Sequence, residues 1–284
     1  MVRIISHRGL DNDTPAFFES TREAFEDKLR HGFGIECDVR FTKDNELVVV
    51  HDHDLTRFSK GADRRGIAEI DSRELLTMEF GGCHLISFRD VLQMVGEHQE
   101  MSAISAVHVK SDMQSDRALA AVLAVVRDAD ISKFFLFDLK LDAARYLKAA
   151  LPAIRLGLSV AHPHDIERFN HLTGGTLFTL EEVISQREYV DWVWLDEWDR
   201  TNKDGTRKAL YTAEVFRRAR DAGFSIAVIS PELHTSPPEQ AMRAGHEDSA
   251  NRETLEHRLR EILALKPDAL CTDHPALVRQ LMIG

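Results

Sequence analysis

The sequence predicts an α/β protein that folds as a single (β/α)8 barrel, with a β-hairpin near the start of the chain. Three observations predict this fold. From residue 104 onward, short apolar segments alternate with amphipathic ones, which is the pattern of βα units around a parallel sheet. Nine segments are candidate strands, one more than the barrel holds, and the hairpin supplies the excess. No linker rich in proline, glycine or serine divides the chain, so we expect one domain over residues 1–284.

Charge and length restrict the possible partners. The chain has 284 residues and a formal charge of −11, so it can bury a large core under an acidic surface. Nucleic acids and anionic membranes select basic patches, which argues against both as partners. A small anionic substrate stays possible, because one local cation reverses the field inside a pocket.

Cysteine usage and apolar runs indicate the compartment. Cys37, Cys83 and Cys271 are widely spaced and form no CxxC pair, which argues against a disulfide framework or a structural zinc site. No apolar run reaches the length of a membrane span, and the first residues lack the apolar core of a signal peptide. We therefore expect a cytoplasmic protein without a membrane span.

The first predicted strand, residues 2–6, runs directly into His7, Arg8 and Gly9. Ends of strands are where α/β proteins place chemistry. Arginine offers a bidentate fork to phosphate, and glycine permits a close backbone approach, so this tripeptide suits an anion. Apolar residues at helical spacing then predict an amphipathic helix over residues 15–30.

The next segment, residues 34–54, reads as two short strands joined by a polar turn. Glu36 and Asp38 lie two apart on the first strand and so project from the same face. With Asp44 and Asn45 as the central residues of a two-residue turn, the register places Asp38 directly opposite His51. Two carboxylates and an imidazole then converge. The alternative is a half-buried hairpin with ordinary surface charges.

A second polar pair lies on the buried strand predicted at residues 104–110, where His108 and Lys110 share one face. A lone histidine there is more often a core residue with a satisfied hydrogen bond. Lys110 weakens that alternative, because a second polar residue on a buried face needs a reason.

The other expected elements complete the barrel. After an irregular polar stretch at residues 55–85 with a short helix from Asp71, a helix starts at Ser87. Further helices are predicted at 117–128, 143–150, 180–186, 212–222, 253–265 and 275–282, and strands at 134–138, 155–160, 190–195, 225–229 and 269–271. The polar connection 231–252 follows a strand, so it is either a rim loop or lid at the catalytic end or a disordered surface insertion.

The polar residues singled out lie near carboxyl ends of predicted strands or on the hairpin, where barrels build active sites. We expect one pocket to contain His7, Arg8, Glu36, Asp38, His51, His108 and Lys110. This set suits phosphoryl chemistry: carboxylates hold a divalent cation, cationic side chains neutralise phosphate oxygens, and two histidines supply a base and an acid.

The chain also resembles the glycerophosphodiester phosphodiesterase family. The matching elements are HRG at 7–9, EST at 19–21, the Glu36-x-Asp38 pair, VVVHD at 48–52, HVK at 108–110, FD at 137–138 and CTDHP at 271–275. The resemblance implies a phospholipase-C-like TIM barrel and divalent-metal-dependent hydrolysis of a glycerophosphodiester to an alcohol and glycerol 3-phosphate. It further implies that His7 and His51 are the catalytic pair.

By the same resemblance, Arg8 and Lys110 contact phosphate, while Glu36 and Asp38 bind the metal. The family usually has a glutamate ligand where this chain has His108, and we expect His108 to take its place. The resemblance implies Mg²⁺ or Ca²⁺, whereas an imidazole ligand also suits Mn²⁺ or another transition metal.

Two further departures concern the triplet at 19–21 and a strand end. Ser20 replaces the usual asparagine, and residues 227–231 replace a tryptophan-containing strand end that helps shape the pocket for the alcohol portion. These departures leave three alternatives open. They are a phosphodiesterase for another diester, such as a sugar diester, a weakened or inactive relative that binds a phosphorylated ligand, and an isomerase or aldolase acting on a sugar phosphate.

Overall fold

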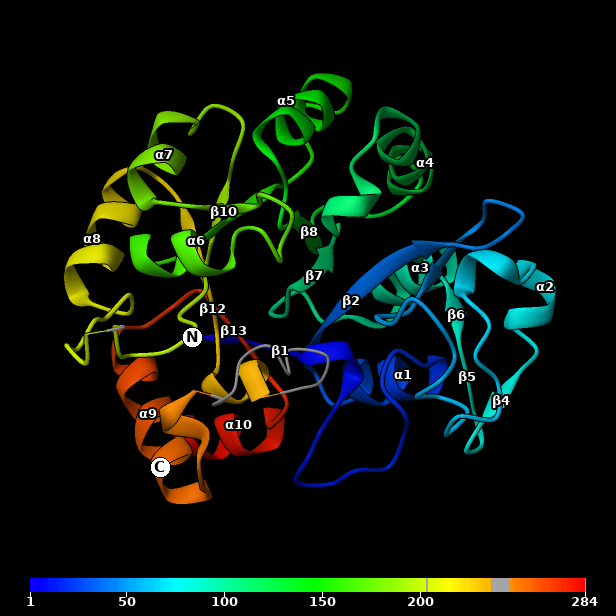
Figure 1. The fold of residues 1–284 in the computed structure, drawn as a ribbon, viewed down its shortest axis with the longest axis horizontal. Helices are drawn as coiled ribbons and strands as arrows, with labels where there is room; N and C mark the ends of the chain where they lie inside the picture. The colour runs from blue at the N-terminus through cyan, green and yellow to red at the C-terminus, as the bar shows by residue number, and fades with distance from the viewer. Residues whose placement is uncertain (203, 236–245, 284) are drawn as a thin grey trace.

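The computed structural model describes residues 1–202, 204–235 and 246–283. Across these ranges, eight parallel strands form a barrel with helices around its outside (Figure 1). The barrel strands are β1 (Arg3–Ser6), β2 (Gly34–Phe41), β7 (Ser105–His108), β8 (Phe134–Phe137), β9 (Gly157–Val160), β11 (Trp192–Leu195), β12 (Ser225–Ile229) and β13 (Ala269–Thr272).

The barrel is a closed ring. Neighbouring strands pair in parallel in the order β8–β7–β2–β1–β13–β12–β11–β9. An isolated parallel bridge between Leu136 and Leu156 joins β8 to the segment leading into β9, where the Leu136 N–H donates to the Arg155 carbonyl at 3.0 Å. Further along, the short strand β10 (Leu177–Phe178) pairs with the end of β9. The predicted eight-stranded barrel is therefore confirmed.

Apolar packing holds the barrel from both sides. Side chains such as Ile5, Ala106 and Phe135 form an inner cluster, and a larger cluster fills the space between strands and helices. Alternation along each strand produces the two layers. Gly34 allows β2 to approach its neighbour, since a Cβ there would lie 1.8 Å from the Ile104 carbonyl oxygen.

The helices follow the strands around the ring. In the described ranges they are α1 (Arg22–Arg30), α3 (Phe88–His98), α4 (Asp116–Val126), α5 (Leu141–Ala150), α6 (Pro163–Phe169), α7 (Leu180–Ser185), α8 (Ala213–Asp221), α9 (Arg252–Ala264) and α10 (Pro275–Ile283). Helix α1 begins later than predicted, because the Thr21 side chain caps it by accepting the Ala24 N–H. The sequence did not predict α6, which has seven residues, or β10, which has two, because elements this short give little pattern to detect.

The hairpin forms, but the predicted register is wrong. Strand β3 (Leu47–Val49) runs antiparallel to β2, and the Val50 N–H donates to the Asp38 carbonyl at 2.9 Å. The turn has three residues and ends on Asn45, which has a φ of 63°. Three-residue hairpin loops commonly end on a residue in this left-handed conformation. The additional turn residue shifts the ladder by one, so His51 lies beyond the end of β3 and not opposite Asp38.

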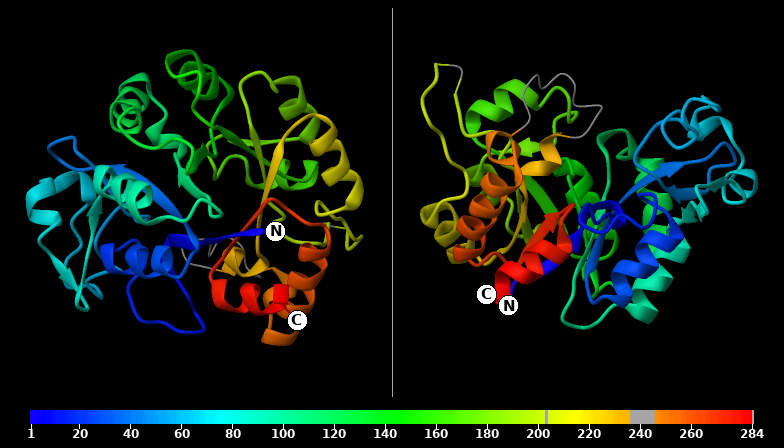
Figure 2. Two further views of the ribbon diagram at one scale, coloured as in Figure 1. Left: turned by 180° about the vertical axis from the view of Figure 1, so that it is seen from behind. Right: turned by 90° about the horizontal axis from the view of Figure 1, so that it is seen from below.

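Between β3 and α3 the chain forms a small lobe that projects to one side of the barrel (Figure 2, right). Its own apolar cluster includes Val48, Leu55 and Phe58. The lobe contains a 3-10 turn (Ile67–Glu69), α2 (Ser72–Leu75), β4 (Glu79–Phe80), β5 (Cys83–His84) and β6 (Ile86–Ser87). Strand β6 pairs with β3 and thereby extends the hairpin into a three-stranded arm.

The predicted rim connection, 231–252, falls partly outside the described residues, which omit 236–245. Its described parts include two 3-10 turns, Pro231–Thr235 and Glu247–Ser249. No helix in the described ranges is long and apolar enough to cross a membrane.

Candidate active site

A cavity of about 890 Å³ opens at the carboxyl ends of the barrel strands. Six of the seven predicted site residues line it: His7, Arg8, Glu36, His51, His108 and Lys110. Asp38 is fully buried and forms ion pairs with three of the six, at 2.8 Å to His108, 3.0 Å to Lys110 and 3.3 Å to Arg8. The structure therefore brings all seven residues together.

His7 follows β1 and is held by Asp273, a carboxylate that is not among the seven predicted site residues. Its Nδ1 lies 2.8 Å from Asp273 Oδ1, while its Nε2 lies 4.0 Å from Glu36 Oε2. Burial and Arg8 lower the pKa of His7, but the two carboxylates outweigh them and raise it overall. Asp273 directly follows β13, so the rule that strand ends carry chemistry points to it as well.

Arg8 occupies a backbone conformation that non-glycine residues rarely adopt. Its φ is 53°, and the next residue, Gly9, has a φ of 76° and no room for a side chain, since a Cβ there would lie 3.0 Å from the Ala24 Cβ. Such a conformation costs on the order of 1–3 kcal/mol and is concentrated at functional sites. Arg8 lines the cavity, and its Nη1 lies 3.4 Å from Glu19 Oε1. Ser20 also has a left-handed φ of 58°, which favours asparagine over serine.

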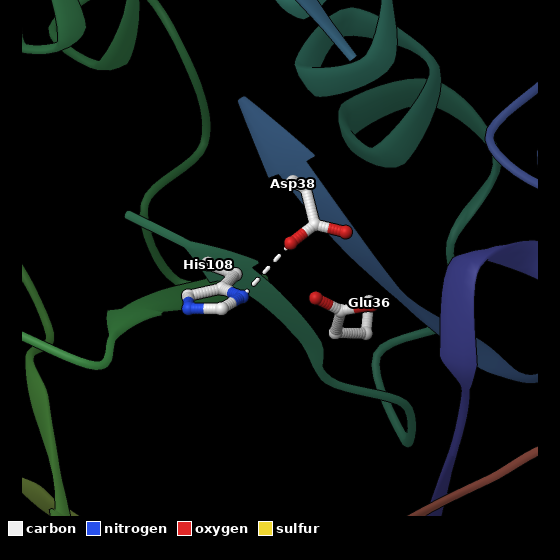
Figure 3. A group of neighbouring side chains, drawn as sticks. All are labelled: Glu36, Asp38 and His108. Atoms are coloured by element: carbon white, nitrogen blue, oxygen red, sulfur yellow. Dashed lines mark ion pairs between the residues drawn. The ribbon is translucent and has the colours of Figure 1, made fainter. Parts of the chain in front are cut away.

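Glu36, Asp38 and His108 form a group that could hold a metal ion (Figure 3). Each offers one ligand atom, and these atoms lie within 4.8 Å of one another. The two acids share a face of β2, and the parallel register sets His108 of β7 beside Asp38.

The donor set fits a divalent cation. Glu36 Oε2 is buried and has no hydrogen-bond partner among the described residues. Burial raises the pKa of Glu36, and the neighbouring Asp38 carboxylate raises it further. A buried carboxylate oxygen without a partner is costly, and a cation between the two acids would remove that cost.

His51 reaches the cavity from the loop that follows β3. Its Nδ1 lies 2.9 Å from Asp52 Oδ1, and Arg57 donates to the other Asp52 oxygen at 2.7 Å. Arg57 also donates to Glu19 at 2.6 Å, which connects this loop to the Arg8 side of the site. Burial lowers the pKa of His51 to about 4, although the Asp38 carboxylate opposes the shift.

His108 contacts a carboxylate through each ring nitrogen. Nδ1 faces Asp38 and Nε2 lies 3.0 Å from Asp138 Oδ2. Burial and Lys110 lower the pKa of His108, but the two carboxylates raise it to about 9. The partners of His108 are therefore the predicted site residue Asp38 and a second carboxylate, Asp138.

Part of the cavity lining is aromatic and begins beside His108, whose ring stacks on Phe137. Phe137 and Trp194 stack with centroids 3.9 Å apart, and Trp198 stacks between Phe169 at 4.4 Å and His234 at 4.7 Å. The departure noted at 227–231 leaves Ile229 in the lining, and the cavity tryptophans come from β11 and the loop after it. These aromatic side chains can accept an apolar or ring-shaped part of a ligand.

The chain is similar to proteins of one known family. The profile of the glycerophosphoryl diester phosphodiesterase family matches residues 7–277. A probable glycerophosphodiester phosphodiesterase 1 of Mycobacterium tuberculosis is 34% identical over 103 residues, 36% of this chain and 34% of that protein. A glycerophosphodiester phosphodiesterase of Caldanaerobacter subterraneus is 32% identical over 101 residues, 33% of this chain and 40% of that protein. The matched region thus spans about a third of these relatives.

Solved structures share the fold. A putative glycerophosphoryl diester phosphodiesterase from Silicibacter pomeroyi superposes with a TM-score of 0.70 at 19% identity, covering 99% of this chain and 93% of that one. A phosphodiesterase from Oleispira antarctica, solved with the product sn-glycerol-3-phosphate, gives a TM-score of 0.65 at 16% identity, covering 99% and 97%.

Proposed function

Because the chain belongs to the glycerophosphoryl diester phosphodiesterase family, we propose that it hydrolyses a small phosphodiester. The best-supported substrate is a glycerophosphodiester, which gives an alcohol and glycerol 3-phosphate. The observation that carries this proposal is the meeting of two histidines, two acids, an arginine, a lysine and His108 around one cavity.

Phosphate binding falls to Arg8 and Lys110. Both cations contact Asp38 from the cavity wall, so their positions are fixed before a ligand arrives. Two preorganised cations would stabilise the charge that develops on the phosphoryl oxygens during displacement. The acidic surface of the protein then matters little, because local charges dominate inside the pocket.

Glu36, Asp38 and His108 would hold one divalent cation. The cation supplies Lewis-acid stabilisation of a phosphoryl oxygen when bound. The imidazole gives the set one nitrogen and two acids, and this favours Mn²⁺ or another transition metal over Mg²⁺ or Ca²⁺.

His7 and His51 serve as the acid–base pair, with His7 as base or nucleophile and His51 as the acid that protonates the leaving alkoxide. In each ring Nδ1 is held by a carboxylate, Asp273 or Asp52, which leaves Nε2 for chemistry. The raised pKa of His7 and the lowered pKa of His51 favour the reverse assignment in the free protein. The reverse assignment is therefore the second candidate.

A substrate with a good leaving group separates the two assignments. A p-nitrophenyl diester needs little protonation of its leaving group, so loss of the acid costs less on it than on an alkyl diester. If His51 is the acid, His51→Ala regains activity on the p-nitrophenyl diester and His7→Ala does not. The opposite pattern assigns the acid to His7.

The activity itself is tested with a panel of diesters. Glycerophosphocholine, glycerophosphoethanolamine and glycerophosphoinositol are each supplied with Mg²⁺, Ca²⁺ or Mn²⁺, and released glycerol 3-phosphate and free alcohol are measured. Turnover that depends on a divalent cation and is lost in His7→Ala supports the proposal. Calorimetric binding of glycerol 3-phosphate without turnover of any diester would support the inactive relative instead.

A further inference from the structure

Asp138, the residue that follows β8, lies between His108 and the next barrel strand. One oxygen is 3.0 Å from His108 Nε2, and the other accepts the Ser159 hydroxyl at 2.7 Å. The residue is only 9% exposed. Both oxygens are thus committed to named partners, and one partner is a residue of the proposed metal site.

The position of the Asp138 carboxylate requires a strained backbone conformation. The φ of Asp138 is 62°, in the left-handed region. The turn is fixed by Gln114, whose amide donates to the carbonyls of Asp138 at 2.8 Å and Val109 at 2.6 Å and accepts the Lys140 N–H at 2.7 Å. A strained conformation persists only where its surroundings determine it, and this one aims a carboxylate at His108.

The ring of His108 is fixed in its plane as well. It stacks on Phe137 with centroids 4.9 Å apart and an interplanar angle of 25°. In a tautomer that carries its proton on Nε2 and donates it to Asp138, the Nδ1 lone pair would face Asp38 and Glu36 and be available to a cation. Metal-bound histidines commonly have this arrangement, in which a carboxylate orients the ring and raises its basicity.

We propose that Asp138, supported by Ser159, is a positioning residue that fixes the tautomer of His108 so that Nδ1 serves as a ligand for a divalent transition metal. This inference rests on the proposed function, since it assigns a role toward the proposed cation. Asp138 acts through His108 and touches neither the cation nor the substrate.

A double-mutant cycle tests the inference with Mn²⁺ alone as the probe. Mn²⁺ affinity is measured by calorimetry for the wild type, Asp138→Asn, His108→Glu and the double variant. Asp138→Asn should weaken binding by about 10–100-fold in the wild-type background. In the His108→Glu background the same change should cause no loss of Mn²⁺ affinity. The introduced carboxylate has no proton for Asp138 to accept, and the two carboxylates repel each other.

Two further measurements distinguish a positioning role of Asp138 from a purely structural one. Asp142→Asn removes the same charge from a side chain that is 96% exposed and should leave Mn²⁺ affinity unchanged. Nitrogen-15 spectra of the Zn²⁺-loaded protein should show His108 protonated on Nε2 in the wild type and a disturbed tautomer in Asp138→Asn. If Asp138→Asn does not fold, Ser159→Ala should give a smaller loss of affinity in the same direction.

The outcomes distinguish this inference from the function on which it rests. Equal Mn²⁺ affinity of wild type and Asp138→Asn, or equal losses in both backgrounds, would overturn the role of Asp138 and leave the metal site intact. Absence of Mn²⁺ binding that is sensitive to Glu36→Gln would overturn the metal site itself.

Discussion

Two groups of buried charge in the molecule differ in their access to the cavity. The first is the site cluster of Glu36, Asp38 and His108. The second, here called the bracing cluster, contains Lys208 and Asp165, which pair at 2.5 Å. The site cluster borders the cavity and leaves a buried Glu36 oxygen without a hydrogen-bond partner among the described residues. Lys208 and Asp165 are not among the residues that line the cavity.

The bracing cluster is organised to hold loops together. Lys208 also contacts the Asp199 carboxylate and carbonyl, both at 2.7 Å. Next to it, Glu197 pairs with Arg258 of α9 and accepts the Leu210 N–H at 2.8 Å. Charge density alone therefore does not mark a functional site. The distinguishing feature is access to the cavity, because Asp165 Oδ1 in the bracing cluster also lacks a hydrogen-bond partner among the described residues.

The largest expected effect is a loss of activity on replacing either catalytic histidine while the fold stays intact. His7→Ala and His51→Ala should each lower kcat/KM by about 10²–10⁴-fold on an alkyl diester, the usual range for loss of an acid–base group. Both variants should stay folded in a thermal unfolding experiment, because neither ring belongs to an apolar core cluster of the described residues. Full activity in either variant would remove that histidine from the mechanism.

The matching change in the bracing cluster should have the opposite signature. Lys208→Met leaves the fully buried Asp165 without its closest cation and should cost about 3–5 kcal/mol of unfolding free energy. At temperatures where the variant is folded, kcat/KM should match the wild type. The double variant Lys208→Met with Asp165→Leu should recover much of the loss. A drop in kcat/KM comparable to that of His7→Ala would contradict the distinction between the clusters.

Acid should weaken the contacts that Glu197 makes next to the bracing cluster. Burial raises the pKa of Glu197, but hydrogen bonding with His246, the Arg258 guanidinium and backbone N–H groups together lower it from 4.5 to about 2. The stability from this lowered pKa is present above pH 4.5 and is lost as the pH falls toward 2. It amounts to about 3 kcal/mol. Urea unfolding from pH 7 to pH 2.5 should show the gap between wild type and Glu197→Gln closing. A gap that stays constant would exclude this origin.

The sequence predicts the site more fully than it predicts the contacts that support it. The seven residues were found because each lies near a strand end or on the hairpin, and barrel topology brings such positions together. The hairpin register was missed because one additional turn residue, ending at Asn45, shifts the ladder, and residue types alone do not determine turn length.

Partners of the site residues depend on distant chain segments. Asp273 meets His7 across 266 residues, and Asp138 reaches His108 across 30 through an unusual φ. Periodicity is local and carries no information on such contacts. A residue-by-residue inspection of every strand end, including those of β8 and β13, is the signal that could have found both acids.

The smallest expected effect comes from Arg8→Lys, which tests whether the Arg8 guanidinium binds phosphate. Arg8→Lys keeps the charge beside Asp38 but loses the planar fork. A hydrogen bond to a charged group contributes about 1.5–3 kcal/mol, so kcat/KM should fall about 10–100-fold if Arg8 binds phosphate through two nitrogens. Arg22→Lys makes the same replacement at an exposed ion pair with Asp90 and should leave kcat/KM unchanged. In both proteins kcat/KM should vary only modestly with ionic strength, because the attracting cations lie inside the pocket while the chain as a whole carries −11. Wild-type kinetics in Arg8→Lys would leave Lys110 and the metal as the phosphate-binding charges and reduce Arg8 to a partner of Asp38.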